Sequence, residues 1–260
     1  MKGATFVLVP GAGGSAWYWH LVSPFLQEHG HEAIAVDLPA ADDRAGLVQY
    51  AEAVIDAVGN RNPEEVVLVA QSLAGFTAPI VCQSLSVGLV VLVNAMIPKP
   101  GETPGEWWGN TGQPNAKREA DERGGRDPRA PFDPITEFFH DVPQAVIDGA
   151  LAQGTPRQSE AVFRSLCSVE AWPSIPTRVL VGHQDRFFPP EFQRRVAQER
   201  LGISAEEMPG GHLVALSQPA ELSTRLLRYV DRRNPGQQQH AVDRASRCPS
   251  MQTLSRFRST

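Results

Sequence analysis

The chain has 260 residues, of which 42% are hydrophobic and 20% are charged, and its net charge is −5. These values are typical of one large soluble domain with a sizeable buried core. Residues 232–260 carry a net +5, so the rest of the chain carries −10, which argues against nucleic acid as a partner. No apolar run approaches the roughly 18 residues that cross a bilayer, and the short apolar run at 4–9 does not fit a signal peptide. We therefore expect a cytoplasmic protein that does not bind membranes.

Short apolar runs alternate with longer helical patterns along most of the chain. Six runs predict strands, at 4–9, 32–37, 65–70, 88–93, 177–182 and 203–208. The patterns between them predict helices at 16–29, 46–59, 73–86, 190–201 and 217–231. Apolar strands that alternate with helices predict an α/β fold with a mostly parallel, doubly wound sheet of about six strands, covered on both faces.

The alternation stops between residues 97 and 171. This segment contains several prolines, a charged stretch at 117–129 and two short helical patterns near 134–140 and 143–152. It is too long for a loop, so it predicts an inserted helical cap over the carboxyl ends of the strands. The predicted organisation is a core of 1–96 and 172–231, a cap of 97–171, and a tail of 232–260. The tail is rich in Gln, Ser and Arg, which predicts disorder.

A candidate nucleophile lies where the third predicted strand meets the next helix. The sequence there is Ala70-Gln71-Ser72-Leu73-Ala74-Gly75, with a small residue two positions before and two positions after the serine. This is the G-x-S-x-G elbow with alanine at both glycine positions, in which a strained turn lifts the serine above the sheet. A serine at such a junction is also a common helix N-cap, so the motif alone leaves both roles open.

A candidate acid and a candidate base follow later strands in the order that the elbow requires. Asp185 follows the strand at 177–182, and His212 follows the last strand in Pro209-Gly210-Gly211-His212. The order Ser72, Asp185, His212 is the one expected for a nucleophile elbow. His183 is the competing histidine. Asp37, at the end of the second strand, is expected to be structural, and the strand at 88–93 ends in Asn94-Ala95-Met96 without a carboxylate.

The first strand ends in a glycine-rich turn, Val9-Pro10-Gly11-Ala12-Gly13-Gly14. We expect the N–H groups of Ala12 and Leu73 to form an oxyanion hole. The turn also matches a dinucleotide-binding fingerprint loosely, so a Rossmann dehydrogenase remains an alternative. The candidate substrate contacts are Gly11 and Met96 at strand ends and Trp107 and Trp108 in the cap. The three cysteines have neither disulfide-framework nor metal-ligand spacing, and no metal is expected.

Over about residues 1–231 the chain resembles the α/β-hydrolase fold superfamily, in the branch of plant methylesterases, hydroxynitrile lyases and related bacterial serine hydrolases. The motifs that carry the resemblance are Val9-Pro10-Gly11-Ala12-Gly13, Trp17-Tyr18-Trp19, Asp37-Leu38-Pro39, Gln71-Ser72-Leu73-Ala74-Gly75, Asp185-Arg186-Phe187-Phe188 and Pro209-Gly210-Gly211-His212. The resemblance implies a serine esterase without cofactor or metal that acts on a small-molecule carboxylic ester, thioester or lactone through an acyl-enzyme. Monomer and homodimer both stay open.

The chain departs from the resembled family at a few positions. Pro10 stands where a histidine is common, and Ala70 and Ala74 replace the elbow glycines. The resembled lyases carry a lysine after the catalytic histidine and a threonine in the oxyanion turn, where this chain has Leu213 and Gly11. These differences favour a carboxylesterase. A hydroxynitrile-lyase-like enzyme and a non-hydrolytic binding protein on the same fold remain alternatives.

Overall fold

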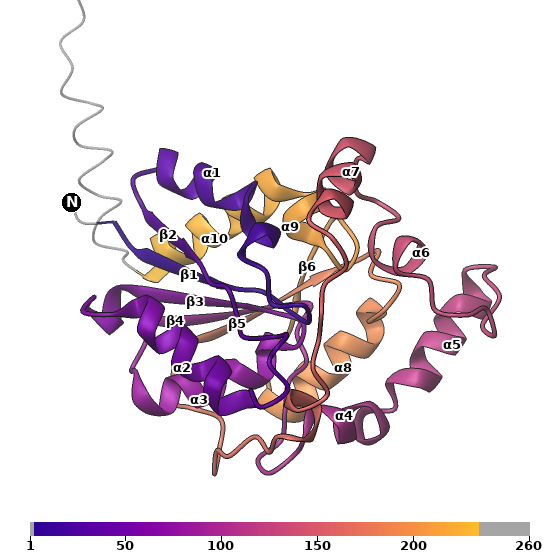
Figure 1. The fold of residues 1–260 in the computed structure, drawn as a ribbon, viewed down its shortest axis with the longest axis horizontal. Coiled ribbons are helices and arrows are strands. Elements are labelled where there is room, and N and C mark those ends of the chain that lie inside the picture. Colours follow the sequence, from indigo (N-terminus) through magenta and orange to yellow (C-terminus); the bar gives the residue numbers. More distant parts are fainter. Residues whose placement is uncertain (1–2, 234–260) are drawn as a thin grey trace, which may run out of the picture.

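The computed structural model describes residues 3–233. Of the predicted tail, only Arg232 and Arg233 are among the described residues, and Cys248 lies outside them. Its centre is a six-stranded sheet in the order β2-β1-β3-β4-β5-β6, and every neighbouring pair is parallel (Figure 1). The strands are β1 (Thr5–Val9), β2 (Glu32–Ala35), β3 (Val66–Gln71), β4 (Leu89–Val93), β5 (Thr177–Gly182) and β6 (Glu206–Met208). The predicted α/β class and strand number are confirmed, and the sheet is parallel throughout.

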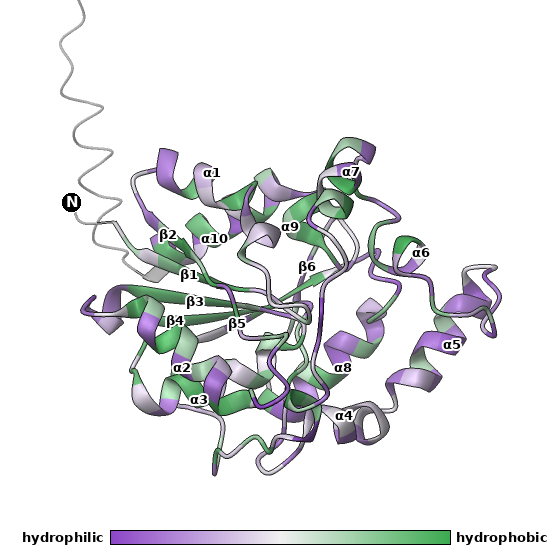
Figure 2. Cartoon of the chain, viewed as in Figure 1, coloured by the Kyte–Doolittle hydropathy of each residue, from purple (hydrophilic) through white to green (hydrophobic). Residues whose placement is uncertain are grey.

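Helices cover both faces of the sheet (Figure 1). On one face lie α2 (Leu47–Val58), α3 (Ala74–Ser84) and α8 (Pro190–Leu201), and on the other lie α1 (Val22–Glu28), α9 (Val214–Ser217) and α10 (Pro219–Arg233). Alternate residues of a strand enter opposite cores, as Val7 and Leu8 of β1 do, because side chains alternate across a strand. The central strands β1, β3 and β4 are therefore apolar over most of their length (Figure 2), whereas the short edge strand β6 begins with Glu206 and Glu207.

One predicted helix is divided in the structure, and another is preceded by a short helix that was not predicted. Residues 16–29 form a 3₁₀ turn, Ala16–Trp19, followed by α1, because Pro24 has no N–H and fits only the first turn of a helix. The predicted helix at 217–231 is α10, and the unpredicted α9 is separated from it at Gln218, directly before Pro219. A residue that precedes proline disfavours the helical conformation. No described helix is both long and apolar enough to cross a membrane.

Residues 97–171, here called the cap segment, connect β4 to β5 and contain α4 (Pro104–Thr111), α5 (Gln113–Arg123), α6 (Pro134–Phe138) and α7 (Gln144–Ala152). These helices lie beyond the carboxyl ends of the strands (Figure 1). Neither α4 nor α5 was predicted from the sequence. The signal for α4 is a capping box, in which Thr103 Oγ1 accepts from Glu106 N at 3.1 Å and Glu106 Oε2 accepts from Thr103 N at 3.0 Å.

A buried ion pair joins the start of the cap segment to α8. The side chains of Glu102 and Arg200 are each 3% exposed, and Arg200 Nη2 donates to Glu102 Oε1 at 3.0 Å. Burial raises the pKa of Glu102, but hydrogen bonds from Arg200, Asn110 and the Lys99 N–H outweigh it, so the pKa lies below its ordinary value. The pair therefore ties the cap segment to the core through an ionised carboxylate.

Candidate active site

Ser72 lies in a strained turn at the end of β3. Its φ is +51°, and Ser72 and Asn94 are the two residues other than glycine with positive φ in the described part of the chain. Three backbone hydrogen bonds hold the turn: Ser72 N donates to Val93 O at 3.2 Å, and Ser72 O accepts from Gly75 N at 3.0 Å and Met96 N at 2.9 Å. A strained backbone conformation of this kind persists only where several surrounding contacts hold it in place. The turn is thus the elbow that the sequence predicted.

Close backbone approach explains two of the glycines around Ser72. A Cβ at Gly75 would collide with the carbonyl oxygen of Met96, and a Cβ at Gly11 would lie 2.8 Å from Ser72 Cβ. Ala70 and Ala74 have ordinary dihedral angles, so alanine suffices where the elbow motif usually has glycine. The glycine-rich turn therefore lies directly against the serine.

The three residues predicted from chain order come together above the sheet. Ser72 Oγ lies 3.1 Å from His212 Nε2, and His212 Nδ1 lies 2.8 Å from Asp185 Oδ2. The three residues are 8%, 3% and 3% exposed, in the order serine, histidine, aspartate. Because a carboxylate accepts hydrogen bonds, the Nδ1 of His212 carries a proton and Nε2 is left to accept from the serine hydroxyl.

Asp185 is fixed by more than the histidine. Its Oδ1 accepts from the N–H groups of Phe187 at 2.9 Å and Phe188 at 2.8 Å, and its Oδ2 also accepts from Gln193 Nε2 at 3.2 Å. Gln193 Nε2 donates to Phe188 O as well, at 2.6 Å. Both carboxylate oxygens therefore have partners besides His212, so the orientation of Asp185 does not depend on the histidine alone.

Asn94, at the end of β4, joins the two loops that carry the acid and the histidine. It is fully buried, and its Oδ1 accepts from Gly182 N at 2.7 Å at the end of β5. Its Nδ2 donates to Gly211 O at 2.9 Å and to His212 O at 3.0 Å. From the sequence, Asn94 was expected only to mark a strand end without a carboxylate. The signal for its role is an amide side chain directly after the apolar run of β4.

In the glycine-rich turn after β1, two N–H groups are bonded within the described structure and that of Ala12 is not. Gly14 N donates to Gly11 O at 3.1 Å, and Gly13 N donates to Gln158 Oε1 at 2.9 Å. Within the described residues the N–H groups of Ala12 and Leu73 donate to no acceptor. Leu73 directly follows the serine at the start of α3, where helix N–H groups point outward. The two groups predicted for an oxyanion hole are therefore unoccupied.

Aromatic rings enclose the imidazole of His212. The ring centroid of Phe138, from α6 of the cap segment, lies 5.2 Å from that of His212 in a stacked arrangement. Phe187 and Phe188, after Asp185, contribute edge contacts at 5.3 Å and 5.0 Å. Trp108 contacts Phe187 at 5.5 Å. The cap segment thus helps to exclude water from the histidine.

The predicted substrate contacts differ in their surroundings. Trp107 is fully buried and donates Nε1 to Ile97 O at 3.0 Å, which favours a role in packing the cap segment. Met96 is also almost fully buried, whereas Trp108 is partly exposed. Gly11 lies beside Ser72, as described above. Contact with a substrate stays a prediction for all four residues.

The competing side chains lie outside the hydrogen-bonded chain. The ring of His183 pairs with Met208 O at 3.1 Å through Nδ1, and the residue is exposed. Asp37 accepts from Ala16 N at 2.7 Å, which is the structural role predicted for it. No group of three or more side chains suited to a metal occurs among residues 3–233.

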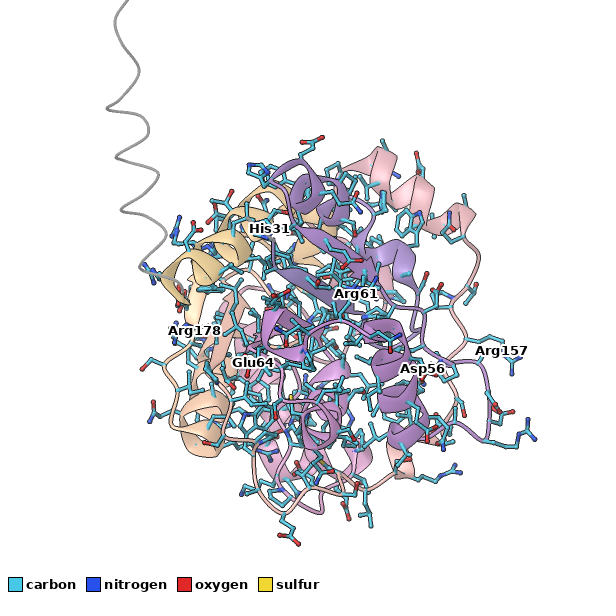
Figure 3. The ribbon with its side chains drawn as sticks, turned by 90° about the vertical axis from the view of Figure 1, so that its left-hand side faces the viewer. His31, Asp56, Arg61, Glu64, Arg157 and Arg178 are labelled. Carbon is cyan, nitrogen blue, oxygen red and sulfur yellow. The ribbon has the colours of Figure 1, made fainter. Side chains whose placement is uncertain are left out.

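Two cavities are lined by residues other than Ser72 and His212. One, of about 390 Å³, borders Asp185 and is lined by Arg123, Arg126, Arg186 and His140 among others. The second, of about 470 Å³, includes His31 and Arg61 at the amino ends of the strands, the side of the molecule that Figure 3 shows. Arg61 there is paired with Glu32 at 2.6 Å, so its charge is already matched.

Comparison with known proteins places the chain in a family. The model of the alpha/beta hydrolase family matches residues 6–225. Polyneuridine aldehyde esterase of Rauvolfia serpentina is 25% identical over 253 residues, which cover 87% of this chain and 95% of the relative. Methyl jasmonate esterase 1 of Vitis vinifera is 33% identical over 105 residues, 36% of this chain and 40% of the relative.

Solved structures agree with the family match. The crystal structure of polyneuridine aldehyde esterase has a TM-score of 0.71 at 25% identity and covers 88% of this chain and 100% of that one. A pyrethroid hydrolase from Sphingobium faniae shares the fold with a TM-score of 0.67 at 19% identity, over 88% and 98% of the chains. The observed strand order also differs from the 3-2-1-4-5-6 order of a Rossmann dehydrogenase, which sets that alternative aside. The chain belongs to the alpha/beta hydrolase family, and its similarity to plant esterases supports an ester-hydrolysing function.

Proposed function

We propose that this protein is a serine carboxylesterase in which Ser72 is the nucleophile, His212 the general base and Asp185 the residue that orients the histidine. The observation that carries the proposal is the hydrogen-bonded chain from Ser72 Oγ to His212 Nε2 and from His212 Nδ1 to Asp185 Oδ2, at 3.1 Å and 2.8 Å. Relatives named as esterases support the reaction class.

The first half of the reaction forms an acyl-enzyme. Ser72 Oγ bonds to the ester carbonyl carbon while its proton moves to His212 Nε2, and the carbonyl π pair moves onto the oxygen. The N–H groups of Ala12 and Leu73 donate to that oxyanion. When the tetrahedral intermediate collapses, the bond to the alcohol oxygen breaks and the alcohol leaves with the proton from Nε2.

The second half releases the acid and restores the serine. A water molecule gives its proton to His212 Nε2 and attacks the acyl carbon, and the bond to Ser72 Oγ then breaks as the proton returns to the serine. Asp185 stabilises the imidazolium in both halves without taking the proton. Leu213, next to His212, is uncharged and offers no stabilisation for a cyanide leaving group, so hydrolysis is favoured over the lyase reaction.

The test combines labelling with turnover. A fluorophosphonate probe should label the wild-type protein at Ser72, and p-nitrophenyl esters of varied acyl length should be hydrolysed. Ser72→Ala and His212→Ala should each lower kcat by about 10³-fold or more with the fold intact. The matched control is His183→Ala, because this histidine is exposed and bonded to Met208 O. A wild-type protein that neither labels nor turns over any ester would refute the proposal in favour of a binding protein.

A further inference from the structure

A residue of the cap segment accepts a hydrogen bond from the glycine-rich turn after β1. Gln158 lies on the stretch that returns from α7 toward β5, 145 positions after Gly13, and its Oε1 accepts the Gly13 N–H at 2.9 Å. Pro156, on the same stretch, packs so closely that a Cβ at Gly13 would lie 2.7 Å from Pro156 Cβ. The chain that leaves the cap segment therefore crosses directly over the glycine-rich turn.

The amide of Gln158 is itself fixed in one orientation. Its Nε2 donates to the hydroxyl of Tyr50, on α2, at 3.0 Å and to Ser159 O at 3.0 Å. Ser159 N in turn donates to Ala40 O at 2.7 Å, and Tyr50 is almost completely buried. With Nε2 engaged on the core side, Oε1 faces Gly13. The core thus determines where this acceptor lies.

The turn needs such support because of its composition. Gly13 and Gly14 have φ of +87° and +62°, and glycine passes between backbone conformations more freely than any other residue. The peptide between Ala12 and Gly13 carries the Gly13 N–H and the Ala12 carbonyl, so an acceptor on that N–H restrains the residue whose own N–H is the proposed oxyanion donor. Stabilisation of an oxyanion depends on donors that are already oriented before the charge develops.

We infer that Gln158 is a positioning residue of the esterase: it occupies the Gly13 N–H and thereby leaves the Ala12 N–H as the donor that faces the oxyanion. The inference rests on the function proposed above. The cap segment would thus contribute to stabilising the transition state, because its acceptor Gln158 Oε1 helps to orient the Ala12 N–H in the core.

Gln158→Ala should lower kcat by about 10- to 100-fold and leave KM within about twofold, because loss of a complete oxyanion donor costs about 10²- to 10³-fold. The second measurement is inhibition by a trifluoromethyl ketone. Ser72 Oγ adds to its carbonyl carbon, the serine proton moves to His212, and the resulting oxyanion lies in the same hole. Its affinity should fall by the same factor as kcat.

The matched control is Arg157→Ala, because Arg157 is the preceding residue and points into solvent (Figure 3). Tyr50→Phe serves as the milder second variant. It removes one acceptor of Gln158 Nε2 and should lower kcat about two- to fivefold, without adding its full effect to that of Gln158→Ala. Amide hydrogen exchange at Gly13, measured without substrate, should be faster in Gln158→Ala than in Arg157→Ala.

The possible failures can be told apart. An active wild type with unchanged kcat and ketone affinity in both Gln158→Ala and Tyr50→Phe overturns the inference and leaves the proposed function standing. Equal loss of kcat in Gln158→Ala and Arg157→Ala also overturns it. A wild type that neither hydrolyses esters nor labels with fluorophosphonate overturns the proposed function, and this inference with it.

Discussion

Asn94 offers the sharpest test of how the candidate site is built. Asn94→Ala removes the partner of three buried backbone groups: the Gly182 N–H, the Gly211 carbonyl and the His212 carbonyl. The His212 carbonyl keeps a weaker contact with Gln71 Nε2 at 3.4 Å. A buried backbone group left without a partner costs about 1–3 kcal/mol, so the two groups that lose their partner completely give an expected loss in the free energy of unfolding of roughly 2–6 kcal/mol.

A second variant separates hydrogen bonding from backbone strain. The φ of Asn94 is +45°, a conformation that disfavours alanine and suits glycine. Asn94→Gly loses the same hydrogen bonds as Asn94→Ala but should be about 1 kcal/mol more stable. Urea unfolding measures both values, with the exposed Asn60→Ala as the control, expected within about 0.5 kcal/mol of wild type. A loss below about 1 kcal/mol in both Asn94 variants would show that this amide does not hold the loops.

Two further outcomes follow from buried groups. Glu102→Ala leaves the buried Arg200 without its carboxylate and should lower the free energy of unfolding by about 3–5 kcal/mol, measured as a fall in Tm of roughly 6–20 °C. The control is Glu199→Ala, in an exposed ion pair on α8, which should lower it by less than about 1 kcal/mol. Because the pKa of Glu102 is lowered in the folded state, its contribution is present above the unfolded value of 4.5 and is lost as pH falls through the folded value, so wild type and variant should converge in acid. Burial raises the pKa of Cys82 to about 12 and that of Cys167 to about 11. In a Cys248→Ser variant, in which these are the two remaining thiols, the native protein should therefore resist iodoacetamide at pH 8 and be labelled only after unfolding. Rapid labelling of the native variant would contradict this.

Periodicity and order were enough to predict the sheet and the candidate triad. Strands such as β3 are apolar on both faces, and that pattern is visible in the sequence without any knowledge of contacts. Ser72, Asp185 and His212 each follow a strand, and parallel strands end at the same edge of a sheet. Their meeting could therefore be predicted from chain order alone.

The α5 helix of the cap segment and the supporting contacts could not be predicted in the same way. The α5 helix is strongly polar, so it has no apolar stripe to reveal it, and only two of its residues are buried. Gln158 contacts Gly13 across 145 positions, and such a contact depends on where the cap segment returns over the core. A single polar residue in a loop shows no period, so its partner follows only from the assembled fold.

The position of the two strained residues suggests how the site keeps its geometry. Ser72 and Asn94 follow the neighbouring strands β3 and β4, and Ser72 N bonds to Val93 O, directly before Asn94. Asn94 N bonds to Leu180 O of β5, and its side chain reaches Gly182 and the loop of His212. Each strand end therefore fixes the next across the sheet. The Ser72 turn keeps its hydrogen bond to Val93 O when the Asn94 side chain is removed. Loss of that side chain should therefore displace His212 more than Ser72.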